Sequence, residues 1–70
     1  MNNPSTITLN GSPHPLHATI TLASLLEIIN LAGQPVVIEL NQHAVFPRDY
    51  AHTLVTAGDH LEIVTLAAGG

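Results

Sequence analysis

One apolar stripe at helical spacing constrains this chain more than any other feature. Four aliphatic side chains occur at positions i, i+3, i+4 and i+7, which places them on one face of a helix: Leu22, Leu25, Leu26 and Ile29. The stripe predicts a helix over residues 21–31, with Thr21 as its N-cap. Asn30, Gly33 and Pro35 supply the signals that end it. A single stripe of this kind must be buried against another element.

The sequence before the stripe alternates like a β-hairpin. Residues 6–10 alternate apolar and polar side chains and end at Asn10-Gly11, a turn signal because both residues tolerate positive φ. The return strand is expected over residues 16–20, with Leu16, Ala18 and Ile20 pointing toward the core. Two prolines just before it, Pro13 and Pro15, indicate an irregular or edge region.

The sequence after the stripe predicts three more strands. A nearly unbroken apolar run over residues 36–40 is typical of a strand well inside a sheet, and residues 43–46 form a short partner strand after the turn at Asn41-Gln42. Residues 48–54 have room for a single helical or 3₁₀ turn, and a turn at residues 57–59 precedes a final strand from His60. Two hairpins and one helix predict an α+β fold in which one mixed sheet packs on the helix.

The chain of 70 residues is expected to form one small domain over residues 6–66. A domain of this size buries only about 60% of the surface that its unfolded chain exposes. It has no cysteine, one Phe and one Tyr, so the core must consist of Leu, Ile and Val. Residues 1–5 are expected to be disordered, and residues 67–70 to be a flexible C-terminal tail.

The charge balance excludes some classes of partner. Arg48 is the single basic residue against five acidic ones, which gives a net charge of −4. Nucleic acids and anionic membranes require clusters of Lys and Arg, so neither is expected as a partner. The acidic balance suits docking onto a more basic protein surface. The first residues do not resemble a signal peptide, and no apolar run is long enough to span a bilayer, so a cytoplasmic location is expected.

The last ten residues, LEIVTLAAGG, lose side-chain bulk step by step toward Gly70. Two glycines bury nothing and lose much backbone entropy when they are ordered. Such an end can enter a narrow slot and present a carboxylate that no neighbouring side chain obstructs. The alternative is an ordinary frayed terminus.

The final strand has two distinct faces. If Leu61 and Ile63 face the helix, three other side chains point outward: Glu62, Val64 and Leu66. Exposed aliphatic residues beside a flexible tail form a candidate docking patch. The alternative is that they are scattered apolar residues of an ordinary surface.

Enzymatic sites find little support in the sequence. The sequence has five histidines but no cysteine, and no two histidines are spaced i, i+4 on a helix, so a metal site is not expected. No Ser or Thr lies in a nucleophile elbow with a base placed for it. Arg48 is expected to have a structural or surface role. The chain is therefore expected to be no enzyme and to bind no cofactor itself.

Four sequence segments resemble the ThiS family of sulfur carriers in thiamine biosynthesis: ITLNG at residues 7–11, VIELN at 37–41, FPR at 46–48 and GDHLEIVTLAAGG at 58–70. They occur in the family's order and spacing over nearly the whole chain. The resemblance implies the ubiquitin-like β-grasp fold, a mixed sheet of four to five strands packed on one helix.

The resemblance also implies a chemistry for the end of the chain. An E1-like adenylating enzyme would use ATP and Mg²⁺ to convert the carboxylate of Gly70 to an acyl-adenylate. A persulfide sulfur donor would then form a thiocarboxylate, from which a thiazole synthase takes the sulfur. Partner-binding residues would be Gly69, Ala68, Leu66, Val64 and Glu62.

Two alternatives share the fold: the small subunit of molybdopterin synthase, also a thiocarboxylate carrier, and a ubiquitin-like protein modifier. Fold alone does not separate these three functions. The chain departs from the family pattern at Ala68, where a third tail glycine is common, and at Tyr50, where Trp is common.

Overall fold

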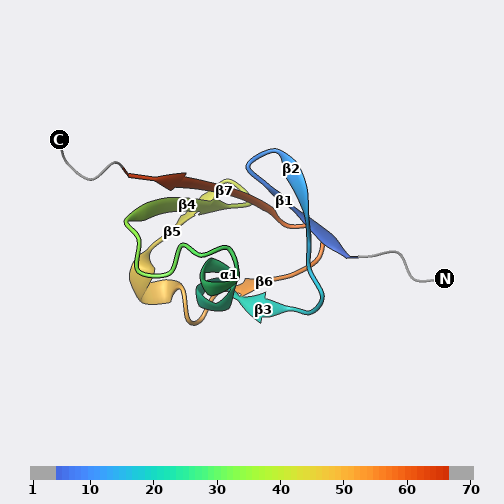
Figure 1. The fold of residues 1–70 in the computed structure, drawn as a ribbon, viewed down its shortest axis with the longest axis horizontal. Coiled ribbons are helices and arrows are strands. Elements are labelled where there is room, and N and C mark those ends of the chain that lie inside the picture. The colour runs from blue at the N-terminus through green and yellow to red at the C-terminus, as the bar shows by residue number, and fades with distance from the viewer. Residues whose placement is uncertain (1–4, 67–70) are drawn as a thin grey trace.

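The computed structural model describes residues 5–66 (Figure 1). The elements follow in this order: β1 (Thr6–Leu9), β2 (Ser12–Pro15), β3 (Ile20–Thr21), α1 (Leu22–Ile28), β4 (Val36–Leu40), β5 (His43–Val45), the 3₁₀ helix η1 (Pro47–Asp49), β6 (Leu54–Val55) and β7 (His60–Thr65). The predictions for residues 1–4 and 67–70 lie outside the described residues.

Five strands form one mixed sheet in the order β2-β1-β7-β4-β5. The pairing of β1 with β7 is parallel, and all other neighbours are antiparallel. Helix α1 packs below one face of this sheet, beside a separate two-stranded sheet of β3 and β6 (Figure 1). The predicted α+β architecture is confirmed, and β4 lies inside the sheet as predicted. The small β3–β6 sheet was not predicted.

The core lies between α1 and the five-stranded sheet. Its buried members are all aliphatic: Ile7, Leu16, Leu22, Leu25, Leu26, Ile38, Val55, Leu61 and Ile63. Within residues 5–66 no polar or charged side chain is buried. The core of Leu, Ile and Val that the composition required is therefore the core that the chain builds.

Helix α1 begins where the sequence predicted and ends earlier. The Thr21 hydroxyl accepts the Ser24 N–H at 3.1 Å, which confirms the N-cap. At the other end Asn30 adopts φ 66°, and its N–H donates to Glu27 O while that of Leu31 donates to Leu26 O. This is the two-bond Schellman arrangement with Asn in the left-handed position. The prediction of a helix to residue 31 was three residues too long.

The return strand of the first hairpin was placed wrongly. Asn10-Gly11 forms the turn, with φ 51° and 84°, and it pairs Leu9 directly with Ser12. The strand therefore occupies Ser12–Pro15 instead of residues 16–20. Leu16 is buried as predicted, whereas Ala18 is exposed. Pro13 and Pro15, which were expected to mark an irregular or edge region, lie within this strand, and the strand is at the edge of the sheet.

Prolines are compatible with β2 because it is an edge strand. Ile7 lies opposite His14, and the Leu16 N–H donates to Ser5 O at 2.9 Å, so the even-numbered residues direct their N–H groups toward β1. The nitrogens of Pro13 and Pro15 therefore face away from the sheet, where no ladder donor is needed.

The link after β5 contains a 3₁₀ turn, one of the two turns that residues 48–54 were predicted to have room for. The turn lies earlier than predicted, because η1 ends at Asp49 and Leu54 already belongs to β6. The carbonyls of this link accept hydrogen bonds from the start of α1: Leu22 N–H donates to Thr53 O at 2.7 Å, and Ala23 N–H donates to Tyr50 O at 3.1 Å. The link thus satisfies donors that a helix leaves without partners in its first turn.

Candidate partner-binding face and C-terminal segment

Strand β7 lies between β1 and β4 in the sheet and leads directly to the predicted reactive segment. It pairs with β4 along five residues, and the Leu66 N–H donates to Pro35 O at 2.8 Å just after the strand ends. Residues 67–70 follow Leu66, so they start from a strand that is held in the sheet. The predicted site residues Ala68, Gly69 and Gly70 lie outside the described residues.

The two faces of β7 are divided as the sequence predicted. Leu61 and Ile63 are buried against the helix side, at 1% and 5% exposure. Glu62, Val64 and Leu66 are exposed. The structure thus brings the three described members of the predicted site onto the surface, next to the start of the C-terminal segment.

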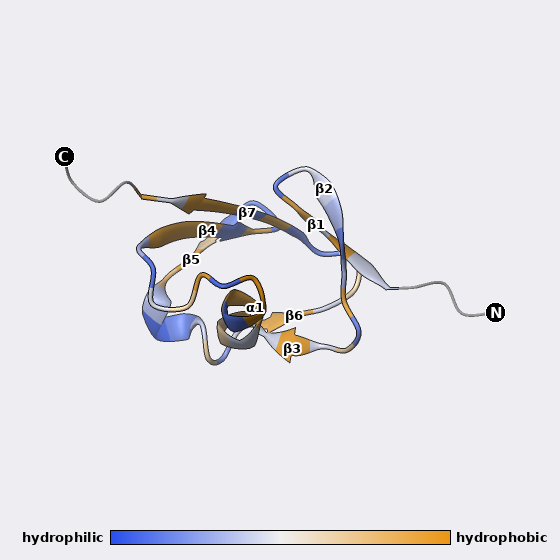
Figure 2. Ribbon diagram, in the orientation of Figure 1, coloured by the Kyte–Doolittle hydropathy of each residue, from blue (hydrophilic) through white to orange (hydrophobic). Residues whose placement is uncertain are grey.

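The apolar part of this surface extends onto β4. Val37 lies directly opposite Val64, and both are about half exposed, as is Leu66. We call Val37, Val64 and Leu66 the outer strip. Figure 2 shows the hydrophobic colouring of β4 and β7 next to each other. Sequence reasoning missed Val37 because it assigned residues 36–40 to a strand well inside the sheet and did not separate the two faces of that strand. The signal was Glu39, which must face solvent and therefore places Val37 on the same outer face.

An acidic pair adjoins the outer strip. Glu39 lies directly opposite Glu62, and both are exposed. Like charges directly opposite each other in a sheet are destabilising. The outer face of β4 and β7 therefore presents apolar side chains next to two carboxylates, a surface suited to a protein partner with basic groups around an apolar centre.

The side chain of Asn10 helps to hold β7. Its Nδ2 donates to Ile63 O at 3.0 Å, and the Ile63 N–H donates to its Oδ1 at 2.7 Å. The Asn10 N–H itself donates to Leu61 O at 2.8 Å. One residue of the first turn thus positions the strand that carries the outer strip. Sequence reasoning used Asn10 only as a turn signal and missed this role.

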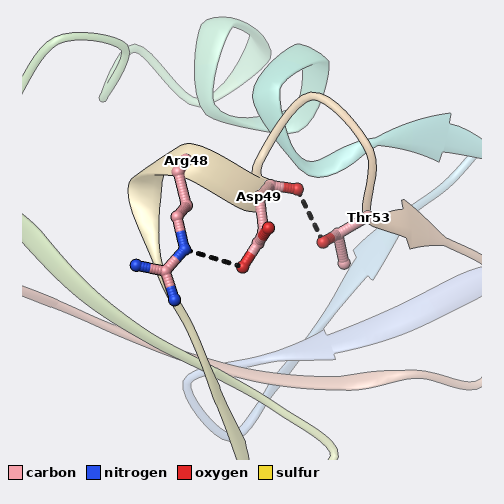
Figure 3. A network of polar contacts seen from close by, with 3 residues as sticks. All are labelled: Arg48, Asp49 and Thr53. Atoms are coloured by element: carbon pink, nitrogen blue, oxygen red, sulfur yellow. Dashed lines mark hydrogen bonds and ion pairs between the residues drawn. The ribbon is translucent and has the colours of Figure 1, made fainter.

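Arg48 lies away from this arrangement, on η1. Its guanidinium is 3.9 Å from the Asp49 carboxylate and stacks over the Phe46 ring, 5.3 Å from the centroid. The Asp49 carbonyl accepts from the Thr53 hydroxyl at 2.8 Å (Figure 3). The Arg48 side chain is 80% exposed, so this ion pair contributes little to stability. These contacts agree with the expected surface role of Arg48.

A groove opens beside Leu66, at the end of the sheet where β7 stops. It has a volume of about 420 Å³, and its lining is largely apolar, including Leu26, Leu31, Pro35, Tyr50 and Leu66. Desolvation in these surroundings raises the pKa of the Tyr50 hydroxyl above its usual value. The groove offers no set of reactive groups; beside its apolar side chains it holds the Tyr50 hydroxyl and the Gln34 amide.

Across residues 5–66 there is no group of three or more His, Asp or Glu side chains arranged to hold a metal ion. None of the helices described there is long and apolar enough to cross a membrane. The outer face of β4 and β7, together with the segment that follows it, is therefore the candidate site.

Comparison with known proteins gives relatives for nearly the whole chain. Thiazole synthases of Magnetococcus marinus and Paramagnetospirillum magneticum are 34% and 33% identical to it over 64 residues, which are 91% of this chain. The chain spans only about a fifth of the length of those two proteins (20% in each). An uncharacterized protein of Porphyra purpurea, ycf40, is 27% identical over 70 residues and matches along 99% of its own length.

Solved structures agree with the fold. The crystal structure of the thiamine biosynthesis protein ThiS from Geobacter metallireducens superposes with a TM-score of 0.79 at 26% identity, covering 93% of this chain and 99% of that one. The solution structure of a thiamine biosynthesis protein from the same organism gives a TM-score of 0.76. The predicted β-grasp fold is confirmed.

The model of the ThiS family matches residues 7–70, which is most of the chain and includes the final glycines. The chain belongs to the ThiS family, the small sulfur carriers of thiamine biosynthesis.

Proposed function

We propose that this chain carries sulfur as a thiocarboxylate on Gly70, when Gly70 is the last residue, and delivers it for thiazole formation. The observation that carries the proposal is the family match, because it extends through the final glycines. The β7 geometry supports it, since the paired strand ends beside an exposed apolar strip, directly before residues 67–70 in the sequence.

The proposed chemistry follows from the reactivity of a carboxylate. A carboxylate is a poor electrophile, and attack of its oxygen on the α-phosphorus of ATP releases pyrophosphate and forms an acyl-adenylate with a good leaving group. A persulfide sulfur then displaces AMP, and cleavage of its sulfur–sulfur bond by a thiol leaves the thiocarboxylate. ATP and Mg²⁺ belong to the E1-like adenylating enzyme, and the persulfide belongs to the sulfur donor.

This chain's part in these steps is presentation. Gly69 and Gly70 add no side chain that would obstruct a narrow active site, and Ala68 adds only a methyl group. The outer strip and the acidic pair of Glu39 and Glu62 form the docking face for the enzyme. Thiazole synthase is proposed as the acceptor, which is supported by the two thiazole synthases whose own chains contain a segment similar to this one.

The test is the intact mass of the protein, ending at Gly70, after incubation with ATP, Mg²⁺, an adenylating enzyme and a persulfide donor. The expected result is a gain equal to sulfur replacing oxygen, and its absence in a variant that lacks Gly70. An unchanged mass with enzymes that modify another ThiS protein would contradict the proposal. Covalent adducts on lysines of other proteins would instead indicate a protein modifier.

The docking face has its own matched pair of variants. Leu66→Glu places a charge in the outer strip, whereas Leu54→Glu places one on β6, at a leucine of similar exposure (58% against 49%). Binding to the adenylating enzyme is expected to weaken about tenfold or more for Leu66→Glu, as for loss of an interface contact, and to stay unchanged for Leu54→Glu. Equal effects of the two substitutions would place the docking face elsewhere.

A further inference from the structure

The two edges of β7 are paired to different lengths. Toward β4, the pairing runs from Leu61 to Thr65, and the Leu66 N–H continues it by donating to Pro35 O at 2.8 Å. In an antiparallel pair, alternate residues direct their backbone groups to the neighbour. The hydrogen bond from Leu66 shows that the even-numbered residues of β7 direct their backbone N–H and C=O groups toward β4. The backbone groups on that edge are therefore paired up to the end of the strand.

Toward β1, the ladder ends much earlier. The last residues in register are Leu9 and Leu61, because β1 turns away at Asn10-Gly11. The two hydrogen bonds between the Asn10 side chain and the Ile63 backbone then take the place of one further ladder residue. The backbone groups on this edge are therefore paired as far as Ile63, where the partner is the side chain of Asn10 and not a strand.

Thr65 lies two residues beyond Ile63, so its N–H and C=O point to this same edge. Within the part of the chain that the structure describes, no hydrogen bond is recorded for either group. The residue is exposed, and Figure 1 shows the end of β7 projecting past the β1–β2 hairpin. Such an unpaired stretch of strand edge can accept a strand from another chain.

The position of this edge relative to Gly70 indicates which chain would use it. Gly70 lies four positions after Leu66, and a chain of that length reaches at most about 14 Å. Any enzyme that acts on Gly70 must therefore bring its active site within about 14 Å of the end of β7, where its surface can cover the strand. Its surface would exclude water from the Thr65 backbone, and buried backbone groups of this kind are nearly always paired.

We propose that the adenylating enzyme adds an extended backbone segment to β7 at Thr65, in line with β1 and next to Asn10. This rests on the proposed function, because it assumes that an enzyme acts on Gly70. Two backbone hydrogen bonds at Thr65 fix the direction of the chain immediately before residues 67–70. The outer strip supplies apolar contact, and the edge supplies orientation.

The test compares Thr65→Pro with Thr65→Ala in binding to the adenylating enzyme. Proline removes the N–H donor, which has no partner within the described chain, whereas alanine removes only side-chain atoms. Thr65→Pro is expected to weaken binding about tenfold or more, and Thr65→Ala to bind like the unchanged chain. Equal binding by the two variants would overturn the proposal. Thermal unfolding of both variants checks that the fold is kept.

Should Thr65→Pro unfold, replacement of the same amide by an ester removes the donor without a ring. Hydrogen exchange at the Thr65 amide gives an independent readout: it is expected to slow on binding of the enzyme. An unchanged exchange rate at Thr65 in a saturated complex would refute the edge pairing. The pairing with the enzyme would also be refuted if exchange at Thr65 slowed in the isolated protein as its concentration increased, because the edge would then bind a second copy of the chain.

The readouts also separate this proposal from the proposed function. The mass gain of the unchanged chain tests sulfur transfer whatever happens at Thr65. Loss of the mass gain, with Thr65 still protected in the complex, would leave the edge pairing standing and remove the sulfur chemistry.

Discussion

The inner and outer faces of β7 have the same backbone and opposite environments. Leu61 and Ile63 alternate with Glu62 and Val64, and only the first two are buried. The twofold period of a strand thus separates residues that stabilise the fold from residues available for recognition, although all are neighbours in sequence. A small carrier can in this way hold its last strand firmly while offering that strand's other face to a partner.

The largest expected effect is on the inner face. Leu61→Ala should lower the free energy of unfolding by about 2–5 kcal/mol, because a fully buried leucine leaves a cavity that the core fills only in part. Val64→Ala, on the outer face of the same strand, should change it by no more than about 0.5 kcal/mol. Urea denaturation measures both values, provided that the variants keep the same dependence of the free energy of unfolding on urea concentration. Similar costs for the two variants would show that the outer face is packed as well.

A smaller effect of opposite sign is expected on the outer face. Glu39→Gln removes the like-charge pair with Glu62 and should raise the free energy of unfolding by about 0.2–1 kcal/mol. The same variant should bind the adenylating enzyme more weakly, since it removes a carboxylate from the docking face. Denaturation midpoints and binding titrations at one fixed salt concentration measure the two effects.

Glu27→Gln is the matched control for binding, because Glu27 is exposed on α1, away from the sheet. It should leave binding unchanged, and it should raise the free energy of unfolding by about 0.3–1 kcal/mol, because it removes a negative charge from the last turn of the helix. If Glu39→Gln stabilises the protein and leaves binding intact, the acidic pair has no part in recognition. The docking face would then consist of the outer strip alone.

Periodicity in the sequence was enough to predict the layers of this fold. The spacing of Leu22, Leu25 and Leu26 located the helix and its buried side, and the alternation around Leu61 separated the faces of β7. Each of these signals is local, because burial on one side imposes the same period along the whole element.

The features that the sequence did not predict depend on contacts between distant segments. The β3–β6 sheet joins Ile20 to Val55, and Asn10 bonds to a strand 53 residues later. Neither partner carries a local sign of the other. The position of β2 was missed for a different reason: whether a proline nitrogen faces a neighbouring strand depends on register, and the register is set by the turn at Asn10-Gly11.

The smallest effect concerns Tyr50, which packs against the core from the helix side. Burial raises its pKa above the value in the unfolded chain, so the folded state holds the phenolic proton more tightly. Its contribution to stability is fully present below about pH 10, the pKa of an unfolded tyrosine, and is lost as the pH rises through the folded value. Cysteine and lysine are absent from the sequence, so Tyr50 is the one side chain expected to titrate there.

Thermal unfolding from pH 8 to pH 11 should therefore show a decline above about pH 10 that Tyr50→Phe abolishes. Val64→Ala should leave the decline as it is, because Val64 lies on the opposite face of the sheet. If the stability of Tyr50→Phe still declined above about pH 10, groups other than Tyr50 would control stability there. The residues that stabilise the fold would then not be confined to the inner face of β7 and the groups packed against it.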